Sequence, residues 1–323
     1  MKAIRIEAAG GPEKLLLADL QTPEPGAGEI RVRNHACGVN FIDTYHRSGL
    51  YRIALPSGLG QEGAGVVETI GAGVTRFKPG DRVAYCSGPI GAYAEAHVVN
   101  AGRAVRLPDA VSFDDAAASM LKGMTARYLL RKTFRVEPQQ VVVIHAAAGG
   151  VGQIAVQWAK HFGATVIATV GSDAKVKIAA ELGADHVIVT SRDDIAKRVR
   201  EITQGEGADV VYDGVGKDAF EASLDCLKPR GMMVTYGNAS GPVAPISPLI
   251  LSQKGSLFLT RPTLAHYTRT TAELDETAAD LFAVIEKGVV KIAPPTRYKL
   301  GDAAQAHRDL EARKTTGSLV LIP

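Results

Sequence analysis

The spacing of apolar side chains changes character along the chain. Near its start, Lys2–Ile6 and Glu29–Arg33 alternate between apolar and polar positions, which is the pattern of half-buried strands. From about residue 141 onward, short apolar runs alternate with segments whose apolar residues recur every three to four positions. This second pattern predicts strands that each lead into a helix, and therefore a parallel sheet covered on both faces.

The first part of the chain, up to about residue 123, has the pattern of short strands joined by tight turns. Further strands are expected over Gly63–Ile70, Arg82–Cys86 and Gly91–Val99, with Pro and Gly residues between them. Many short strands with Gly-rich corners predict a partly open β-barrel.

The second part is organised around the stretch from Val141 to Lys160. A β-branched run, Val141–His145, ends in a turn that holds Gly149, Gly150 and Gly152, and a helical pattern follows at once. Ala147 stands where the common G-x-G-x-x-G motif has its first glycine. Because the turn follows a strand and opens a helix, it predicts a doubly wound fold that binds a dinucleotide pyrophosphate. The strands expected in this sheet are Val141–His145, Ala164–Val170, His186–Thr190, Ala208–Asp213, Gly231–Tyr236 and Ser256–Thr260.

The end of the second strand indicates which dinucleotide is bound. An acidic residue there would accept a hydrogen bond from the ribose 2′-hydroxyl of NAD, but this chain has Gly171 and Ser172. Lys175 follows about one helical turn later and can meet a 2′-phosphate, with Arg192 as a second possible cation. Asp173 opposes this reading and is interpreted as an acid at a helix N-terminus. The pattern favours NADPH.

The last sixty or so residues return to shorter elements. Helices are expected over Thr271–Lys287 and Asp302–Glu311, and a closing strand over Gly317–Ile322. These pieces are too small to form a core alone, so we expect them to complete the first domain. The alternative is a separate C-terminal lobe.

Two polar segments of the first domain are candidates for chemistry. The first runs from Gly38 to Tyr51 and the second from Gly60 to Gly65. The alternatives are a solvated helical turn in which Tyr45 and Tyr51 only pack, and a plain Gly-rich turn.

Composition narrows the functional classes. The net charge is only +3, which gives no electrostatic reason to expect nucleic acid as a partner. No apolar run is long enough to span a membrane, and the chain starts directly in a strand pattern rather than a signal peptide. The three widely spaced cysteines fit a reduced, cytoplasmic protein.

The chain resembles the zinc-free quinone oxidoreductases of the zeta-crystallin type, in the medium-chain dehydrogenase/reductase superfamily. This resemblance implies an α/β protein with a GroES-like, partly open β-barrel catalytic domain over residues 1–124 and 262–323. It also implies a Rossmann domain over residues 125–261 and a cleft between the two. The motifs that carry the resemblance span nearly the whole chain: Asn40–Tyr45, Arg47–Tyr51, Lys122–Thr125, His145–Gly152, Tyr236–Asn238, Gln253–Leu257 and Thr260–Pro262.

The resemblance also bears on metal chemistry. Zinc-dependent alcohol dehydrogenases of the superfamily have a ligating Cys and His where this chain has Asn40 and Gln61. Amides are poor zinc ligands, and Cys37 lies three residues from the ligand position. Without a Lewis acid an alkoxide is hard to stabilise, so alcohol oxidation is disfavoured and reduction of an electron-poor quinone is favoured.

The resemblance implies site residues as well. The catalytic polar lining would be Asn40, Asp43, Tyr45 and Tyr51. Thr190 stands where relatives commonly have a Tyr near the adenosine, which weakens the case for stacking there. The implied cofactor-binding residues are Asn40, Phe41, Ile42, Thr125, Gly149, Gly150, Val151, Gly171, Ser172, Lys175, Thr190, Asn238, Thr260 and Arg261.

Two other functions are compatible with the same residues. One is NADPH-dependent reduction of alkenals or enones, and the other is a binding protein of the RNA-binding or crystallin type. A homodimer is expected because Ser256–Thr260 has the pattern of an edge strand, which can pair with a second copy.

Overall fold

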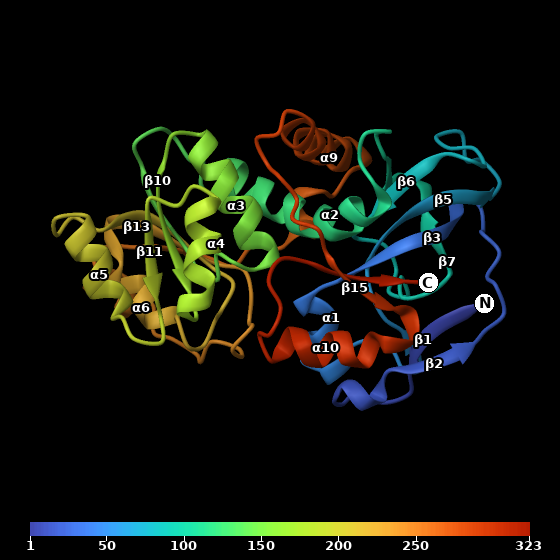
Figure 1. The fold of residues 1–323 in the computed structure, drawn as a ribbon, viewed down its shortest axis with the longest axis horizontal. Coiled ribbons are helices and arrows are strands. Elements are labelled where there is room, and N and C mark those ends of the chain that lie inside the picture. The colour runs from blue at the N-terminus through green and yellow to red at the C-terminus, as the bar shows by residue number, and fades with distance from the viewer. The chain divides into compact units, whose positions relative to one another are not determined.

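The computed structural model describes all residues from Met1 to Pro323 (Figure 1). The chain forms two compact units, which we call the barrel unit and the nucleotide unit. The barrel unit comprises Met1–Met124, Thr268–Glu286 and Ile292–Pro323, and the nucleotide unit comprises Thr125–Tyr267 and Lys287–Lys291. The boundaries of the functional domains named above stay a prediction.

The barrel unit is built on two sheets. The larger has the order β15-β16-β3-β5-β6-β8, with β7 also paired to β3, and the smaller has the order β2-β1-β4. The closing strand β16 runs antiparallel to β3, with Val320 opposite Gly38. The strands are β1 (Lys2–Ile6), β2 (Leu16–Asp19), β3 (Glu29–Val39), β4 (Ser57–Gly58), β5 (Glu62–Ile70), β6 (Arg82–Tyr85), β7 (Ala96–Asn100), β8 (Ala104–Arg106), β15 (Thr296–Lys299) and β16 (Leu319–Ile322).

Two sequence expectations for this unit are wrong. The strand expected over Gly91–Val99 begins only at Ala96, because the backbone of residues 91–93 donates hydrogen bonds to the loop carbonyls of Leu59 and Gly60. A long helix spans Phe113–Tyr128, in a region that the sequence pattern indicates as strands and turns. Its start has a local cause, because the Ser112 hydroxyl accepts a hydrogen bond from the Asp115 N–H.

The helices that accompany the barrel unit include three of functional interest. Helix α1 follows β3, helix α2 starts in this unit and continues across its boundary, and α10 contacts α1. The helices are α1 (Phe41–Ser48), α2 (Phe113–Tyr128), α9 (Thr271–Glu286) and α10 (Ala303–Glu311).

The nucleotide unit has a six-stranded sheet with the order β11-β10-β9-β12-β13-β14, and every pair in it is parallel. This is the strand order of a dinucleotide-binding fold, which confirms the predicted fold class. The strands are β9 (Val141–Ile144), β10 (Thr165–Val170), β11 (His186–Val189), β12 (Ala208–Asp213), β13 (Leu227–Thr235) and β14 (Phe258–Thr260). The helices are α3 (Gly150–His161), α4 (Val176–Glu181), α5 (Ile195–Ile202), α6 (Phe220–Asp225), α7 (Leu249–Gln253) and α8 (Leu264–Tyr267).

Burial explains why the sheet forms. Val143, Ile167 and Val211 on adjacent strands are fully buried in one apolar cluster, which includes residues of α6. The apolar face expected for the helix after β9 is present, with Ile154 and Trp158 of α3 buried. Burying each of these large side chains contributes about 1.5–3 kcal/mol.

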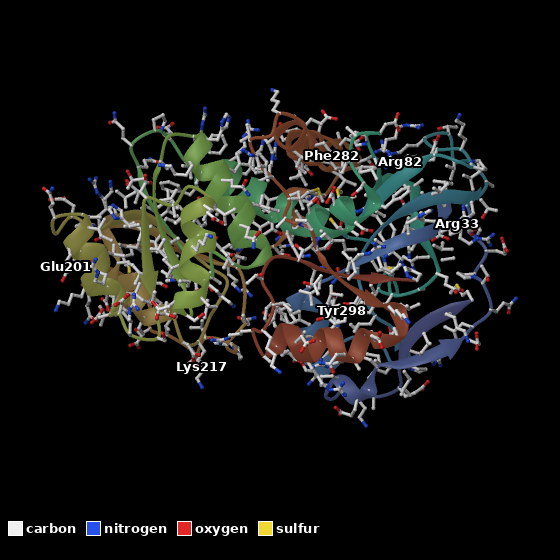
Figure 2. The ribbon with its side chains drawn as sticks, viewed as in Figure 1. Arg33, Arg82, Glu201, Lys217, Phe282 and Tyr298 are labelled. Carbon is white, nitrogen blue, oxygen red and sulfur yellow. The ribbon has the colours of Figure 1, made fainter.

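Charged side chains such as Glu201 and Lys217 are exposed at the surface (Figure 2). None of the helices combines the length and the apolar character that crossing a membrane requires.

Candidate functional site

The turn between β9 and α3 is shaped by a close backbone approach. A Cβ on Gly152 would lie 2.4 Å from the Ala146 carbonyl oxygen, so a side chain does not fit there without backbone movement. Ala147, at the position of the missing first glycine, is accommodated and fully buried. The N–H groups of Gly150 and Val151, in the first turn of α3, have no acceptor within the helix and lie at its positive end. The turn therefore suits a phosphate group.

The other predicted cofactor residues of this unit lie at or just beyond the carboxyl ends of the parallel strands. This is the edge at which such sheets bind ligands. Arg261 follows β14, and its guanidinium donates to the Thr235 carbonyl oxygen at 3.0 Å. Two buried side-chain oxygens at this edge, Asp213 Oδ2 and Thr235 Oγ1, have no hydrogen-bond partner. The residues placed here are Gly171 and Ser172 after β10, Thr190 after β11, Asn238 after β13, and Thr260 and Arg261 at the end of β14.

The segment after β10 has room for an extra group. A Cβ on Gly171 would have no atom within 4 Å. Asp173 begins a short 3-10 helix, Asp173–Lys175, as the sequence predicted, and it forms an exposed ion pair with Arg192. Lys175 is the last residue of this 3-10 helix and stays the predicted partner of a 2′-phosphate.

Thr125 lies within α2 and is buried. Asn40, Phe41 and Ile42 belong to the barrel unit, where Asn40 precedes α1 and the other two begin it.

Asn40 is held by a buried charge pair. Its amide donates from Nδ2 to Glu62 Oε2 at 2.8 Å, and the Lys122 ammonium lies 3.4 Å from the same oxygen. The other carboxylate oxygen of Glu62 accepts the Leu121 N–H at 2.7 Å. Glu62 is fully buried, so removing either charged partner would leave an uncompensated charge.

The prediction that Asp43 lines the substrate site is wrong. Its side chain is completely buried, and Oδ2 accepts hydrogen bonds from the Asn40 N–H and the Tyr93 hydroxyl, both at 2.8 Å. Oδ1 is buried without a partner. Burial raises the pKa of Asp43 to about 7, which the bonds to Tyr93 and Asn40 only partly oppose. Asp43 therefore caps α1 rather than contacting a substrate.

That Tyr45 and Tyr51 line the substrate site stays a prediction. Both are half-buried, their rings meet edge to face with centroids 5.2 Å apart, and the Tyr51 N–H donates to the Tyr45 carbonyl at 3.0 Å. The solvated-turn alternative for this segment does not hold, because Asp43, Thr44 and Arg47 of α1 are buried.

Asn40 and Gln61, which stand where related alcohol dehydrogenases have zinc ligands, both make side-chain contacts through their amides. Asn40 is bonded to Glu62, and Gln61 Nε2 lies 3.5 Å from His46 Nδ1. Cys37 is fully buried, and burial raises the pKa of its thiol to about 12. A thiol with this pKa stays protonated near neutral pH.

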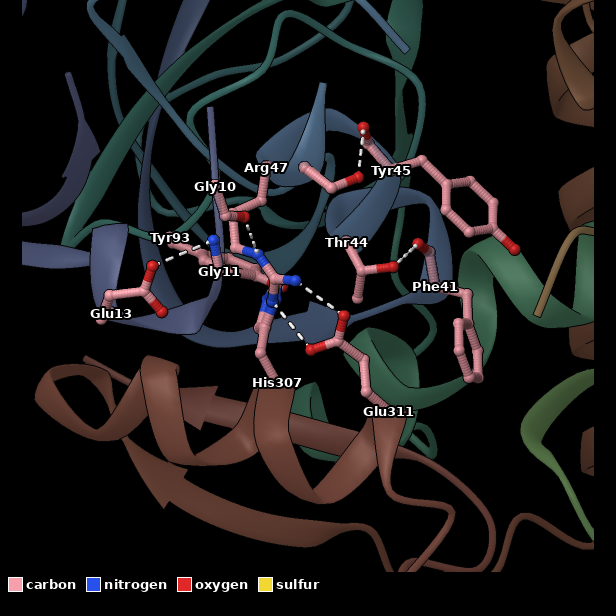
Figure 3. A network of polar contacts seen from close by, with 11 residues as sticks. Gly10, Gly11, Glu13, Phe41, Thr44, Tyr45, Arg47, Tyr93, His307 and Glu311 are labelled. Atoms are coloured by element: carbon pink, nitrogen blue, oxygen red, sulfur yellow. Dashed lines mark hydrogen bonds and ion pairs between the residues drawn. The ribbon is translucent and has the colours of Figure 1, made fainter. Parts of the chain in front are cut away.

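The sequence reasoning missed the group that surrounds Asp43. Tyr93 and His307 come from distant parts of the barrel unit, and Arg47 and Glu311 complete the group (Figure 3). No local pattern marks His307, because its partners are more than 200 positions away.

Comparison with known proteins is consistent along the whole chain. The zinc-binding dehydrogenase family matches residues 150–283, and the alcohol dehydrogenase GroES-like domain matches residues 26–109. A quinone oxidoreductase of Pseudomonas aeruginosa is 54% identical over 100% of this chain and 99% of its own. The crystal structure of Escherichia coli quinone oxidoreductase complexed with NADPH superposes with a TM-score of 0.99 at 49% identity, covering 100% of both chains. A 2-haloacrylate reductase of a Burkholderia species is 46% identical over 98% of each chain. With identities of this size over its full length, the chain belongs to the quinone oxidoreductase family of the medium-chain dehydrogenases and reductases.

Proposed function

We propose that this protein reduces quinones with NADPH and without a metal ion. The observation that carries the proposal is the pairing of a dinucleotide turn with amide side chains where related alcohol dehydrogenases bind zinc. Gly152 admits no side chain, and the Asn40 amide is already bonded to Glu62. The family membership supports the same activity.

The residues present fit NADPH. The turn at Gly149, Gly150 and Val151 would bind the pyrophosphate, because backbone N–H groups at a helix start attract anions. The space at Gly171, with Ser172 and Lys175, would accept the 2′-phosphate. NADPH supplies the hydride when it is bound, and the protein's part is orientation of the reacting atoms.

The remaining predicted cofactor contacts complete this assignment. Asn40, Phe41, Ile42 and Thr125 would face the nicotinamide, whereas Thr190, Asn238, Thr260 and Arg261 would face the remainder of the cofactor. Tyr45 and Tyr51 would line the substrate side, where a phenol hydroxyl can donate a hydrogen bond to a quinone oxygen.

A quinone suits a metal-free site for a chemical reason. An alcohol must lose a proton as it loses hydride, and zinc stabilises the resulting alkoxide. A quinone is itself electron-poor and stabilises the charge that arrives with the hydride. Oriented hydrogen-bond donors then suffice.

The test is oxidation of NADPH, followed by its absorbance, with 1,4-benzoquinone and 9,10-phenanthrenequinone as acceptors. We expect turnover that is unchanged after dialysis against EDTA and that exceeds turnover with 3-buten-2-one. NADPH that binds but reduces no quinone would contradict the proposal, as would activity that EDTA abolishes and zinc restores. Faster turnover of the alkenone would favour the enone reductase alternative, and the 2-haloacrylate reductase relative is a reason to include that substrate.

We also propose that residues 1–124 and 262–323 form the catalytic domain and residues 125–261 the cofactor domain. The compact units support the first boundary, since they separate between Met124 and Thr125. Their second separation lies between Tyr267 and Thr268, and residues 287–291 also belong to the nucleotide unit. A cytoplasmic location is proposed as well, and the three free, buried cysteines support it.

A homodimer is proposed through the edge of the six-stranded sheet. β14 forms that edge, and Phe258 on it is 58% exposed, with Leu249 of α7 60% exposed. Exposed edges and large apolar side chains invite pairing with a second copy. Sedimentation velocity should give twice the chain mass, and Phe258→Lys should give the monomer. Leu16→Lys is the matched control, because Leu16 is an exposed residue on the edge strand β2 of another sheet. A monomeric wild type would refute the dimer.

A further inference from the structure

A line of buried hydrogen bonds connects the C-terminal helix α10 to the start of α1. At its outer end the Arg47 guanidinium is bound by both oxygens of Glu311, at 2.6 and 3.0 Å, and donates to the Gly10 carbonyl at 3.1 Å (Figure 3). Arg47 also donates to His307 Nδ1 at 3.0 Å. The line continues through His307 Nε2 to the Tyr93 hydroxyl at 3.2 Å and from there to Asp43.

The direction of these bonds is set by chemistry. A guanidinium only donates, so His307 Nδ1 must accept and the ring proton must sit on Nε2. Nε2–H then donates to the Tyr93 oxygen, and the Tyr93 hydroxyl donates to Asp43 Oδ2. Burial, together with Arg47, lowers the pKa of His307 to about 3, so the ring is neutral as this direction requires.

The line ends on the residue that the cofactor assignment needs most. Asp43 Oδ2 also accepts the Asn40 N–H, and the Asn40 amide is bonded to Glu62. Asn40 is therefore held through its backbone from one side and through its side chain from the other. All of these residues lie in the barrel unit, and they link segments more than 200 positions apart in sequence.

We propose that His307, Tyr93 and Arg47 are positioning residues that hold Asn40–Ile42 in the conformation that meets the nicotinamide. This inference rests on the proposed function for its kinetic consequences. Hydride transfer depends on reacting atoms about 3–3.5 Å apart, and a misplacement of 1 Å can cost about a hundredfold in rate.

Stability alone is a weak explanation for this group. Buried charged groups are costly to desolvate, and well-packed apolar side chains in their place are often as stable or more so. A directional line that ends on a capping carboxylate instead specifies one conformation of the helix start. That is a property a cofactor contact needs.

Two buried tyrosines of the same unit provide a matched test. Tyr93 and Tyr85 are both fully buried, and each hydroxyl donates to one side chain, Tyr93 to Asp43 and Tyr85 to Asn34. Phenylalanine in place of either removes one hydroxyl and keeps the ring. Only Tyr93→Phe interrupts the line to Asn40.

We expect Tyr93→Phe to lower kcat/KM for quinone reduction roughly tenfold or more and to enlarge the deuterium isotope effect with 4-deuterated NADPH. Its affinity for NADPH should fall, whereas its affinity for adenosine 2′,5′-bisphosphate, which lacks the nicotinamide, should not change. Tyr85→Phe should leave all four quantities unchanged. Equal effects of the two variants, or equal loss of affinity for NADPH and the bisphosphate, would overturn the proposal.

A second pair of variants covers the case in which Tyr93→Phe does not fold. In His307→Gln the side-chain amide can still accept from Arg47 and donate to Tyr93. In His307→Leu the side chain can do neither. We expect Gln to retain most of the activity and Leu to show the Tyr93→Phe defects. If Gln and Leu behave alike, the proposal fails. If the wild type reduces no quinone, the proposed function fails, but the comparison of NADPH with the bisphosphate still tests the positioning role.

Discussion

Asn in place of Asp43 should make the free energy of unfolding rise with pH between about 4 and 6.5, by about 3 kcal/mol relative to the wild type. The physical reason is that the pKa values of Asp43 and His307 shift in opposite directions on folding. The pKa of Asp43 rises from 3.8 to about 7, and that of His307 falls from 6.5 to about 3. Burial is the largest cause of both shifts.

The sign follows from counting protons. Near pH 5 the unfolded chain carries a proton on His307 and none on Asp43, whereas the folded chain carries one on Asp43 and none on His307. The two states bind equal numbers of protons from this pair, so the pair adds no pH dependence in that range. The His307 contribution alone would make the folded state less stable as the pH falls below 6.5. The Asp43 contribution alone would make the folded state less stable as the pH rises above 3.8.

Each single variant leaves only the other group's contribution to the pH dependence of the free energy of unfolding. In Asp43→Asn the His307 contribution remains, and stability rises with pH towards 6.5. In His307→Gln the Asp43 contribution remains, and stability falls between pH 4 and 7, by roughly 3–4 kcal/mol. The Asn amide suits the site, because its oxygen can accept both bonds now made to Asp43 Oδ2.

Urea unfolding of the wild type and both variants at pH 4, 5, 6 and 7 measures these slopes. The double variant is the control and should return to the wild-type slope. The charged groups that contribute to the Asp43 shift, Glu62 and Lys122, and the one that contributes to the His307 shift, Arg47, stay in place in all four proteins. Parallel curves for all of them would refute the opposite shifts.

Asp in place of Gly171 should exchange the cofactor preference. A Cβ at this position would have no atom within 4 Å, and the backbone there needs no positive φ, so a side chain can be added without strain. A carboxylate there would repel the 2′-phosphate of NADPH and accept a hydrogen bond from the 2′-hydroxyl of NADH. Like charges brought together cost several kcal/mol, so we expect NADPH affinity to fall by about 10²–10³-fold while NADH affinity rises.

Gly171→Asn is the matched control because it has the same shape without the charge. It should weaken NADPH binding far less than Gly171→Asp does. Titration of cofactor fluorescence measures all the dissociation constants. If the Asp and Asn variants bind NADPH equally, the 2′-phosphate does not lie at Gly171.

The nucleotide unit could be anticipated from the sequence because its signals are local. An apolar run such as Ala208–Asp213 is buried on both faces of a parallel sheet and so contains few polar residues. Gly152 marks the close approach of the α3 backbone to the backbone of Ala146, and the strand-turn-helix pattern around Gly152 already indicates this approach. The barrel unit was harder, because its turns depend on distant carbonyls, as those of Leu59 and Gly60 show.

By itself the sequence determined the doubly wound sheet, the glycine turn, the absence of an acid at Gly171 and Ser172 and the amides at Asn40 and Gln61. Each of these depends on residues that are close along the chain. Only the tertiary structure decided that Asp43 is a buried cap and not a substrate contact. Its environment comes from Tyr93 and, beyond it, His307, which folding brings together from positions 50 and 264 residues further along the chain. Burial and hydrogen bonding across such separations set the role and the pKa of a carboxyl group, and no local pattern records them.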